Sequence, residues 1–201
     1  MGSGRAEVYI IESLNEDDDR EGEVIYRTLK MAGKDPVYRY IRTVNELQHF
    51  VDDFEDSEYR YLHLSCHGSR RGIATTLDQI SIAAFAEIVG PALDNRRLFL
   101  STCLASTMEM ATAVFAAGGA TSVVGPTNKI HFDDSVILWS SFYHLMFKTN
   151  FKRMKRMDIK ENLAKAALLV GEKVSLFHPR SVTDRRARSL NLPARSPGSL
   201  V

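Results

Sequence analysis

Cysteine is scarce in this chain, which has only Cys66 and Cys103 among its 201 residues. Two thiols are too few for a disulfide scaffold, and no secretory pattern opens the chain, so we expect a reducing, cytoplasmic location. No apolar run approaches the roughly 20 residues that a membrane helix needs, so a membrane partner is not expected. Neither sign of charge prevails, because the formal net charge is +1, and no overall field would attract nucleic acid.

The composition that remains is that of an ordinary globular protein, with 44% apolar and 25% charged residues. Its length suits one domain with a sizeable core, which we expect over residues 5–178. Residues 1–4, Met-Gly-Ser-Gly, are typical of a cloning remnant. Residues 179–201 combine five arginines and one aspartate with prolines and serines, a composition that predicts a basic, flexible tail.

Short β-prone runs alternate with helical stretches along the chain. The β-prone runs cover residues 8–11, 37–43, 59–66, 97–102 and 121–125. The helical stretches cover residues 20–33, 45–54, 81–93, 106–117, 133–147 and 158–170. Three of these helices are expected to begin at the capping residues Asn45, Ser81 and Ser106, the last in a capping box with Glu109. Such alternation predicts an α/β fold, a three-layer αβα sandwich with a mostly parallel sheet.

Two of the predicted strands end in residues that can carry nucleophilic chemistry. The third ends in Cys66-His67-Gly68 and the fourth in Ser101-Thr102-Cys103. Ligands of an open parallel sheet bind outside the carboxyl ends of its strands, so neighbouring strands would bring His67 and Cys103 together. There His67 can take the thiol proton, and the dipole of the following helix favours the thiolate. The backbone N–H groups of Gly68 and Cys103 are candidate oxyanion donors.

Strand periodicity distinguishes the two cysteines. Alternation places His63, Ser65 and His67 on one face of the third strand, and Cys66 on the other face in an apolar row. We therefore expect Cys66 to be a buried structural thiol. The same parity argues against a zinc site made from the cysteines and histidines of this region, and the chain has no Cys-x-x-Cys pair. No Gly-x-Ser-x-Gly elbow of a serine hydrolase occurs.

Several blocks of the sequence resemble the caspase-like (clan CD) cysteine peptidases, in particular the CHAT-domain group, the bacterial relatives of caspases and separase. In chain order the blocks are LHLSCHG (62–68), LFLSTCLAS (98–106), AAGGATSVVG (116–125), SSFYHLMF (140–147) and NLAKAALLV (162–170). The resemblance implies a caspase-like sandwich in which His67 is the base and Cys103 the nucleophile of peptide hydrolysis. It implies no metal or organic cofactor. One departure is Leu104-Ala105-Ser106, where CHAT sequences have a Glu-Thr-Gly-like triplet.

By this resemblance the chain is expected to be a hydrolase, a cytoplasmic cysteine endopeptidase in a regulated bacterial pathway of antiviral defence or cell death. Its substrate would be a protein, such as a pore-forming protein or another effector encoded nearby, and its regulation would come from an activating partner, from processing or from a removed region. The alternative is a catalytically inactive caspase-like module that binds other proteins. The reactivity of Cys103 separates the two.

Two charged pairs are candidate selectors of the substrate residue before the cleaved bond (P1). Asp133 and Asp134 would select a basic side chain, although the helix dipole alone also favours acids in a first turn. Arg70 and Arg71 would select an acidic side chain, or form a solvated loop. Because the two pairs predict opposite substrates, the sequence leaves the specificity open. The basic cluster over residues 152–156 is expected to be a solvated loop without a nucleic-acid partner, since no binding motif accompanies it.

Overall fold

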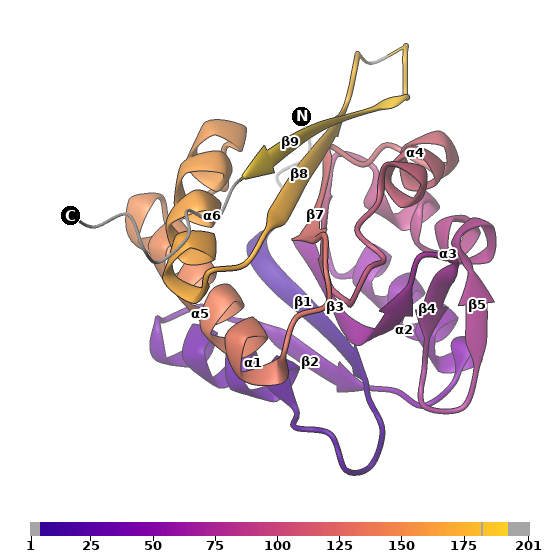
Figure 1. Cartoon of the computed structure of the whole chain (residues 1–201), viewed down its shortest axis with the longest axis horizontal. Coiled ribbons are helices and arrows are strands. Elements are labelled where there is room, and N and C mark those ends of the chain that lie inside the picture. Colours follow the sequence, from indigo (N-terminus) through magenta and orange to yellow (C-terminus); the bar gives the residue numbers. More distant parts are fainter. Residues whose placement is uncertain (1–4, 182, 193–201) are drawn as a thin grey trace.

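The computed structural model describes residues 5–181 and 183–192, which form a nine-stranded sheet covered by helices (Figure 1). The strand order of the main sheet is β2-β1-β3-β6-β7-β8-β9. The strands of this path are β1 (Arg5–Ser13), β2 (Val37–Tyr40), β3 (Tyr59–Ser69), β6 (Arg97–Ser101), β7 (Ser122–Pro126), β8 (Val174–Pro179) and β9 (Ala187–Leu192). Strands β2 to β7 of this path pair in parallel, which confirms the predicted, mostly parallel sheet.

Two groups of helices cover the two faces of the sheet. Figure 1 shows α1, α5 and α6 together on one face, and α2, α3 and α4 on the other, so the predicted three-layer αβα sandwich is confirmed. The helices are α1 (Glu21–Met31), α2 (Val44–Asp56), α3 (Ile82–Val89), α4 (Met108–Ala117), α5 (Phe132–Thr149) and α6 (Arg156–Val170), with a 3-10 turn η1 (Pro91–Leu93). Within residues 5–181 and 183–192, none of the helices has the length and apolar character needed to cross a membrane.

The central pair of strands, β3 and β6, positions the residues of interest. Residues 61–65 of β3 lie in parallel register beside residues 97–101 of β6. Cys66 packs into the apolar core under α2, α3 and α4. On the opposite face, the Nδ1 atom of His63 lies 2.9 Å from the hydroxyl of Tyr143 in α5. The predicted neighbourhood of these two strands and the predicted face of each side chain are thus confirmed.

The start of α2 differs from its predicted position. Thr43 caps this helix, because its hydroxyl accepts a hydrogen bond from the N–H of Glu46 while the Glu46 carboxylate accepts one from the N–H of Thr43. The predicted cap, Asn45, already lies inside the first turn, so that prediction is wrong. Ser81 caps α3 as predicted. A threonine followed three residues later by a glutamate was the stronger local signal for α2.

Two short pairings in the structure have no counterpart among the predicted strands. Strands β4 (Gly72–Ala74) and β5 (Gln79–Ser81) form a small antiparallel unit beside the end of β3, and three residues carry too little periodicity to be recognised. Strand β9 pairs antiparallel with β8 inside the predicted flexible tail. The tail prediction is therefore wrong for residues 187–192, whose backbone hydrogen bonds extend the sheet. The predicted remnant at residues 1–4 and the end of the tail, residues 193–201, lie outside the described residues.

Candidate active site

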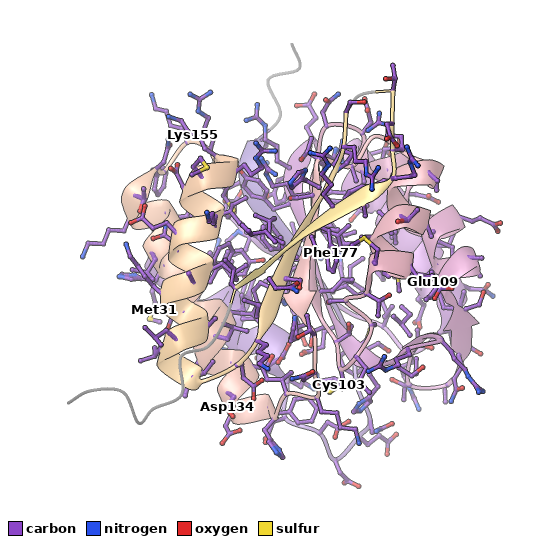
Figure 2. All side chains as sticks on the ribbon, turned by 45° about the horizontal axis from the view of Figure 1, so that its top comes forward. Met31, Cys103, Glu109, Asp134, Lys155 and Phe177 are labelled. Carbon is purple, nitrogen blue, oxygen red and sulfur yellow. The ribbon has the colours of Figure 1, made fainter. Side chains whose placement is uncertain are left out.

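His67 and Cys103 lie close to one another at the carboxyl ends of β3 and β6. Both line a cavity of about 70 Å³, and so do Leu14, Glu21, Cys66, Ser101, Ile130, Phe132 and Ser135. Figure 2 shows Cys103 and Asp134 at the same end of the molecule and Lys155, from the basic cluster, at the opposite end. The two residues that the strand arrangement predicts to meet are thus brought to one cavity.

His67 is held in place by an acid from the connection between β1 and α1. The Oδ2 atom of Asp18 lies 2.7 Å from Nε2 of His67, and the side-chain amide of Asn15 lies 3.0 Å from the same nitrogen. A carboxylate only accepts hydrogen bonds, so Nε2 carries the proton and donates it to Asp18, the shorter contact. The amide nitrogen of Asn15 also only donates, so its bond is to Asp18 and not to His67, and Nδ1 is the nitrogen of His67 that can accept another bond. Burial opposes ionisation of Asp18, but its hydrogen bonds to His67 and Asn15 outweigh burial and hold the pKa of Asp18 below its usual value.

The thiol of Cys103 is half-buried and donates a hydrogen bond to the backbone carbonyl of Ile130 at 3.6 Å. No hydrogen bond joins the described side chains of His67 and Cys103, although the two line the same cavity. Contacts between a nucleophile and its base are often loose before substrate binds and tighten in the complex. The arrangement therefore suits a nucleophile and a base that substrate brings into contact.

The chain turns sharply directly after Cys103. Leu104 has φ = 59°, a left-handed conformation that residues with a side chain seldom adopt. Because of this turn, α4 begins only at Met108 and is capped by Thr107, so the prediction of Ser106 as its cap is wrong. Residues 104–107 separate the thiol from the first turn of α4 in the chain. Strained backbone of this kind concentrates at functional sites.

Gly68 lies directly against the backbone that carries Cys103. A Cβ atom at Gly68 would lie 2.7 Å from the carbonyl oxygen of Cys103 and 3.1 Å from the Cβ atoms of Thr102 and Ala105. Only glycine therefore allows the ends of β3 and β6 to approach this closely. The N–H groups of Gly68 and Cys103 remain the predicted oxyanion donors.

A buried carboxyl group forms part of the cavity wall. Glu21 opens α1, is 2% exposed, and has no hydrogen-bond partner for its Oε1 atom in the described part of the chain. Burial raises the pKa of Glu21 to about 7, although the hydroxyls of Ser101, Ser135 and Ser65 oppose the shift. The sequence does not mark Glu21 as a site residue, because an acid in the first turn of a helix is ordinarily explained by the helix dipole.

Cys66 is the buried thiol that strand periodicity predicts, with 4% of its surface exposed. Burial raises the pKa of the Cys66 thiol well above its ordinary value, so the thiol stays protonated and is a poor nucleophile. Cys66 nevertheless lines the cavity that Cys103 shares. Of the two cysteines, the geometry favours Cys103 for chemistry.

The predicted acidic selectors lie near this cavity without lining it. Asp133 is exposed and Asp134 is half-buried, both in the first turn of α5. Their neighbours Phe132 and Ser135 line the cavity instead. The helix dipole accounts for both aspartates at this position.

The predicted basic selectors lie beside a second, larger groove. This groove has a volume of about 430 Å³ and follows β3, β4 and β5. Arg71 lines it, whereas Arg70 is exposed at the turn between β3 and β4. His67 lines the groove as well as the smaller cavity, so the two spaces meet at the candidate base.

The comparisons with known proteins give these residues no assigned roles. No family model matches the chain, and no curated protein matches it. The roles of His67, Cys103 and Asp18 are therefore inferred from their geometry and from the motifs that contain them.

Proposed function

We propose that this chain is a cysteine endopeptidase in which Cys103 is the nucleophile and His67 the base. The observation that carries the proposal is the cavity that both residues line at the carboxyl ends of β3 and β6. The contact of 2.7 Å between Asp18 and Nε2 of His67 adds the orienting acid that such a base needs.

The chemistry follows from the tautomer that Asp18 imposes on His67. Nδ1 takes the thiol proton, and the thiolate of Cys103 attacks the substrate carbonyl carbon. The oxyanion that forms is stabilised by the backbone N–H groups of Gly68 and Cys103. The C–N bond then breaks, the amine leaves with the proton from His67, and water hydrolyses the resulting thioester. Asp18 stabilises the imidazolium between these steps.

A polypeptide substrate suits the space around the candidate dyad. The groove of about 430 Å³ runs past His67 along β3, β4 and β5, and this volume is within the range of ligand-binding clefts. The smaller cavity beside Cys103 can receive one side chain of that substrate. This pairing of a groove with a side-chain pocket supports an endopeptidase.

The family-like blocks that carry His67 and Cys103 support a biological role for this activity. We place the peptidase in a regulated bacterial pathway of antiviral defence or cell death in the cytoplasm. Its target is a protein, such as a pore-forming protein or another effector, and a partner activates it.

One observation favours a second function, that of a catalytically inactive interaction module. The thiol of Cys103 bonds to the carbonyl of Ile130 and not to His67. In that case the fold would serve only to bind other proteins, and neither residue of the dyad would be needed for chemistry.

Digestion of a diverse peptide library distinguishes the two functions. The protein is incubated with the library, and new peptide ends are identified by mass spectrometry. We expect new ends with the wild type, none with Cys103→Ala, and a loss of about 100-fold or more in rate with His67→Ala, the usual contribution of a general base. His49→Ala, which removes an exposed histidine on α2, is the matched control and should cleave normally. Cleavage that persists in Cys103→Ala, or that is as fast with His67→Ala as with the wild type, would contradict the proposal.

A further inference from the structure

We propose, building on the proposed peptidase function, that the cavity beside Cys103 selects lysine at P1, and that Glu21 is the residue that recognises its ammonium group. The predicted selectors Asp133, Asp134, Arg70 and Arg71 do not line this cavity. Glu21 does, and its carboxyl belongs to α1, a helix distant in sequence from both candidate catalytic residues.

The buried side of the cavity carries acceptors suited to an ammonium group. The Oε1 atom of Glu21 is buried without a hydrogen-bond partner in the described part of the chain. The hydroxyls of Ser101 and Ser135 lie beside Glu21 and are 2.7 Å from one another. A lysine ammonium group has three N–H donors and no acceptor, so one carboxylate and two hydroxyls can satisfy it completely.

A comparison with Glu12 shows why the free oxygen of Glu21 matters. Glu12 is also buried, but its Oε1 accepts a hydrogen bond from the N–H of Gly22 at 2.7 Å and its Oε2 accepts one from the hydroxyl of Tyr38 at 2.6 Å. Both oxygens of Glu12 are thus bonded by the fold itself, whereas the Oε1 atom of Glu21 has only the nearby serine hydroxyls beside it and no hydrogen bond of its own in the described part of the chain. A buried polar atom left without a partner destabilises the fold, and a ligand that supplies the partner removes that penalty.

The remaining walls suit the aliphatic part of a lysine side chain. They include Leu14, Ile130 and Phe132, which are apolar. Lysine buries its methylene stem along such surfaces while its charged end reaches a polar partner. An acidic P1 side chain would instead meet the carboxyl of Glu21, and a like charge there is unfavourable.

The acceptors of the cavity favour lysine over arginine. The Glu21 carboxylate and the hydroxyls of Ser101 and Ser135 can each accept one of the three N–H donors of an ammonium group. A guanidinium group has five N–H donors, so the same three groups would leave two of them without a partner.

Covalent labelling of Cys103 tests the assignment without a known substrate. Peptidyl chloromethyl ketones that differ only at P1, with lysine, norleucine or arginine, react as the thiolate displaces chloride and a C–S bond replaces the C–Cl bond. The rate of labelling is followed by peptide mass spectrometry, with iodoacetamide as a reagent that has no P1 group. We expect the lysyl probe to react about 10- to 100-fold faster than the norleucyl probe, as a charged hydrogen-bond partner predicts. The arginyl probe should be slower than the lysyl probe.

The variant Glu21→Gln should remove the lysyl advantage, measured as the ratio of the lysyl to the norleucyl rate, and the iodoacetamide rate corrects that comparison for any change in Cys103 itself. Ser135→Ala is a second variant, expected to reduce the lysyl rate by about three- to tenfold through one lost hydrogen bond. Glu87→Gln, which removes an exposed acid on α3, is the matched control and should keep the full advantage.

The outcomes separate this inference from the proposed function. Equal lysyl and norleucyl rates in the wild type, a lysyl advantage that survives Glu21→Gln, or an arginyl probe faster than the lysyl probe would each overturn the lysine assignment. In those cases, a Cys103 that reacts with iodoacetamide in the folded protein would still support the proposed peptidase function. If iodoacetamide labels Cys103 only after denaturation, the peptidase itself is refuted and the lysine assignment with it.

Discussion

The two faces of the central sheet differ in physical character. Under α2, α3 and α4 the sheet presents apolar side chains, such as Leu62, Leu64 and Leu100. Under α1, α5 and α6 the apolar core is interrupted by buried polar residues, namely Glu12, Glu21, His63, Ser65, Ser101 and Ser135. Within the described residues, five of the seven buried side-chain atoms without a hydrogen-bond partner lie on this polar face, on Glu21, His63, Ser65, Trp139 and Ser140.

The difference shows which face contains buried polar groups that lower the free energy of unfolding. A buried donor or acceptor without a partner destabilises a fold by about 1–3 kcal/mol. His67 and Cys103 lie at the end of the polar face, so the least satisfied part of the interior adjoins the candidate site. Natural proteins retain such groups mainly where function needs them. Both faces contain an apolar core, and we infer from the proposed function that the polar groups of the second face are retained for a ligand.

The largest expected effect contrasts two neighbouring residues of β3 that point to opposite faces. Leu64→Ala should lower the free energy of unfolding by about 2–5 kcal/mol, because it opens a cavity among close-packed side chains. Ser65→Ala removes a small buried hydroxyl that lies beside Glu12 and Glu21 without a close hydrogen bond of its own, so it should change stability by about 1 kcal/mol or less. Urea denaturation measures both. An equal loss in the two variants would erase the distinction between the faces.

The second prediction concerns the pH dependence of stability. Burial raises the pKa of Glu21 in the folded protein to about 7, so folding favours the protonated form of this carboxyl. The resulting contribution to the free energy of unfolding is fully present below 4.5, the pKa in the unfolded chain. It is lost as the pH rises to about 7. Glu21→Gln should therefore raise the free energy of unfolding by up to about 3 kcal/mol at pH 8 and change it little at pH 4. Thermal unfolding at the two pH values measures this.

Glu12→Gln is the matched comparison for that experiment. Both oxygens of Glu12 accept hydrogen bonds, and an amide nitrogen cannot replace one of them. Burial raises the pKa of Glu12 as well, but the lost hydrogen bond opposes the gain from removing the charge, so Glu12→Gln should stabilise the protein less at pH 8 than Glu21→Gln does. Equal changes in the two variants would show that Glu21 is a satisfied structural acid.

The third prediction tests the close approach of β3 to Cys103. Gly68→Ala places a Cβ atom 2.7 Å from the carbonyl oxygen of Cys103, so the strand ends must separate, at a loss of about 1–3 kcal/mol in stability. The reactivity of Cys103 should fall with it. Gly171→Ala is the control, since it introduces strain at φ = 75° with open space around it. A similar loss of Cys103 reactivity in both variants would assign the effect to general destabilisation.

The smallest expected effect comes from the acid that orients His67. Asp18→Asn should slow Cys103 labelling and peptide cleavage by about tenfold near neutral pH, because Nε2 of His67 loses its charged partner. The pKa of Asp18 is lowered, so the wild type should keep its advantage until the pH falls below that value, and the two proteins should then converge. Asp17→Asn, an exposed neighbour, is the control. Parallel pH profiles for Asp18→Asn and the wild type would exclude the orienting role.

The parts of the fold that the sequence predicts are those with strong local patterns. Alternating apolar residues identify β3 and β6 and the face on which Cys66 lies, and the carboxyl ends of parallel strands bring His67 and Cys103 together. The three-residue strands β4 and β5 lack such a pattern. Strand β9 is hidden in an arginine-rich segment whose composition is typical of a tail.

The rest of the candidate site is invisible in the sequence for a physical reason. Asp18 and Glu21 belong to a connection and a helix start in which acids are common, and only the tertiary fold turns them toward His67 and the cavity. Helix α4 begins later than its local pattern indicates because the strained turn at Leu104 displaces it. Long-range contacts, and not local propensity, decide these features.

The most direct test of the account is thiol alkylation of the folded protein from pH 5 to 9, read at both cysteines by peptide mass spectrometry. The account predicts that Cys103 reacts well below the pH of about 8.5 at which a free thiol ionises, and that His67→Ala abolishes this while His49→Ala does not. Cys66 should stay protected throughout. If Cys103 instead reacts as an ordinary thiol, with the same pH profile whether or not His67 is present, the dyad is not assembled and the peptidase is refuted.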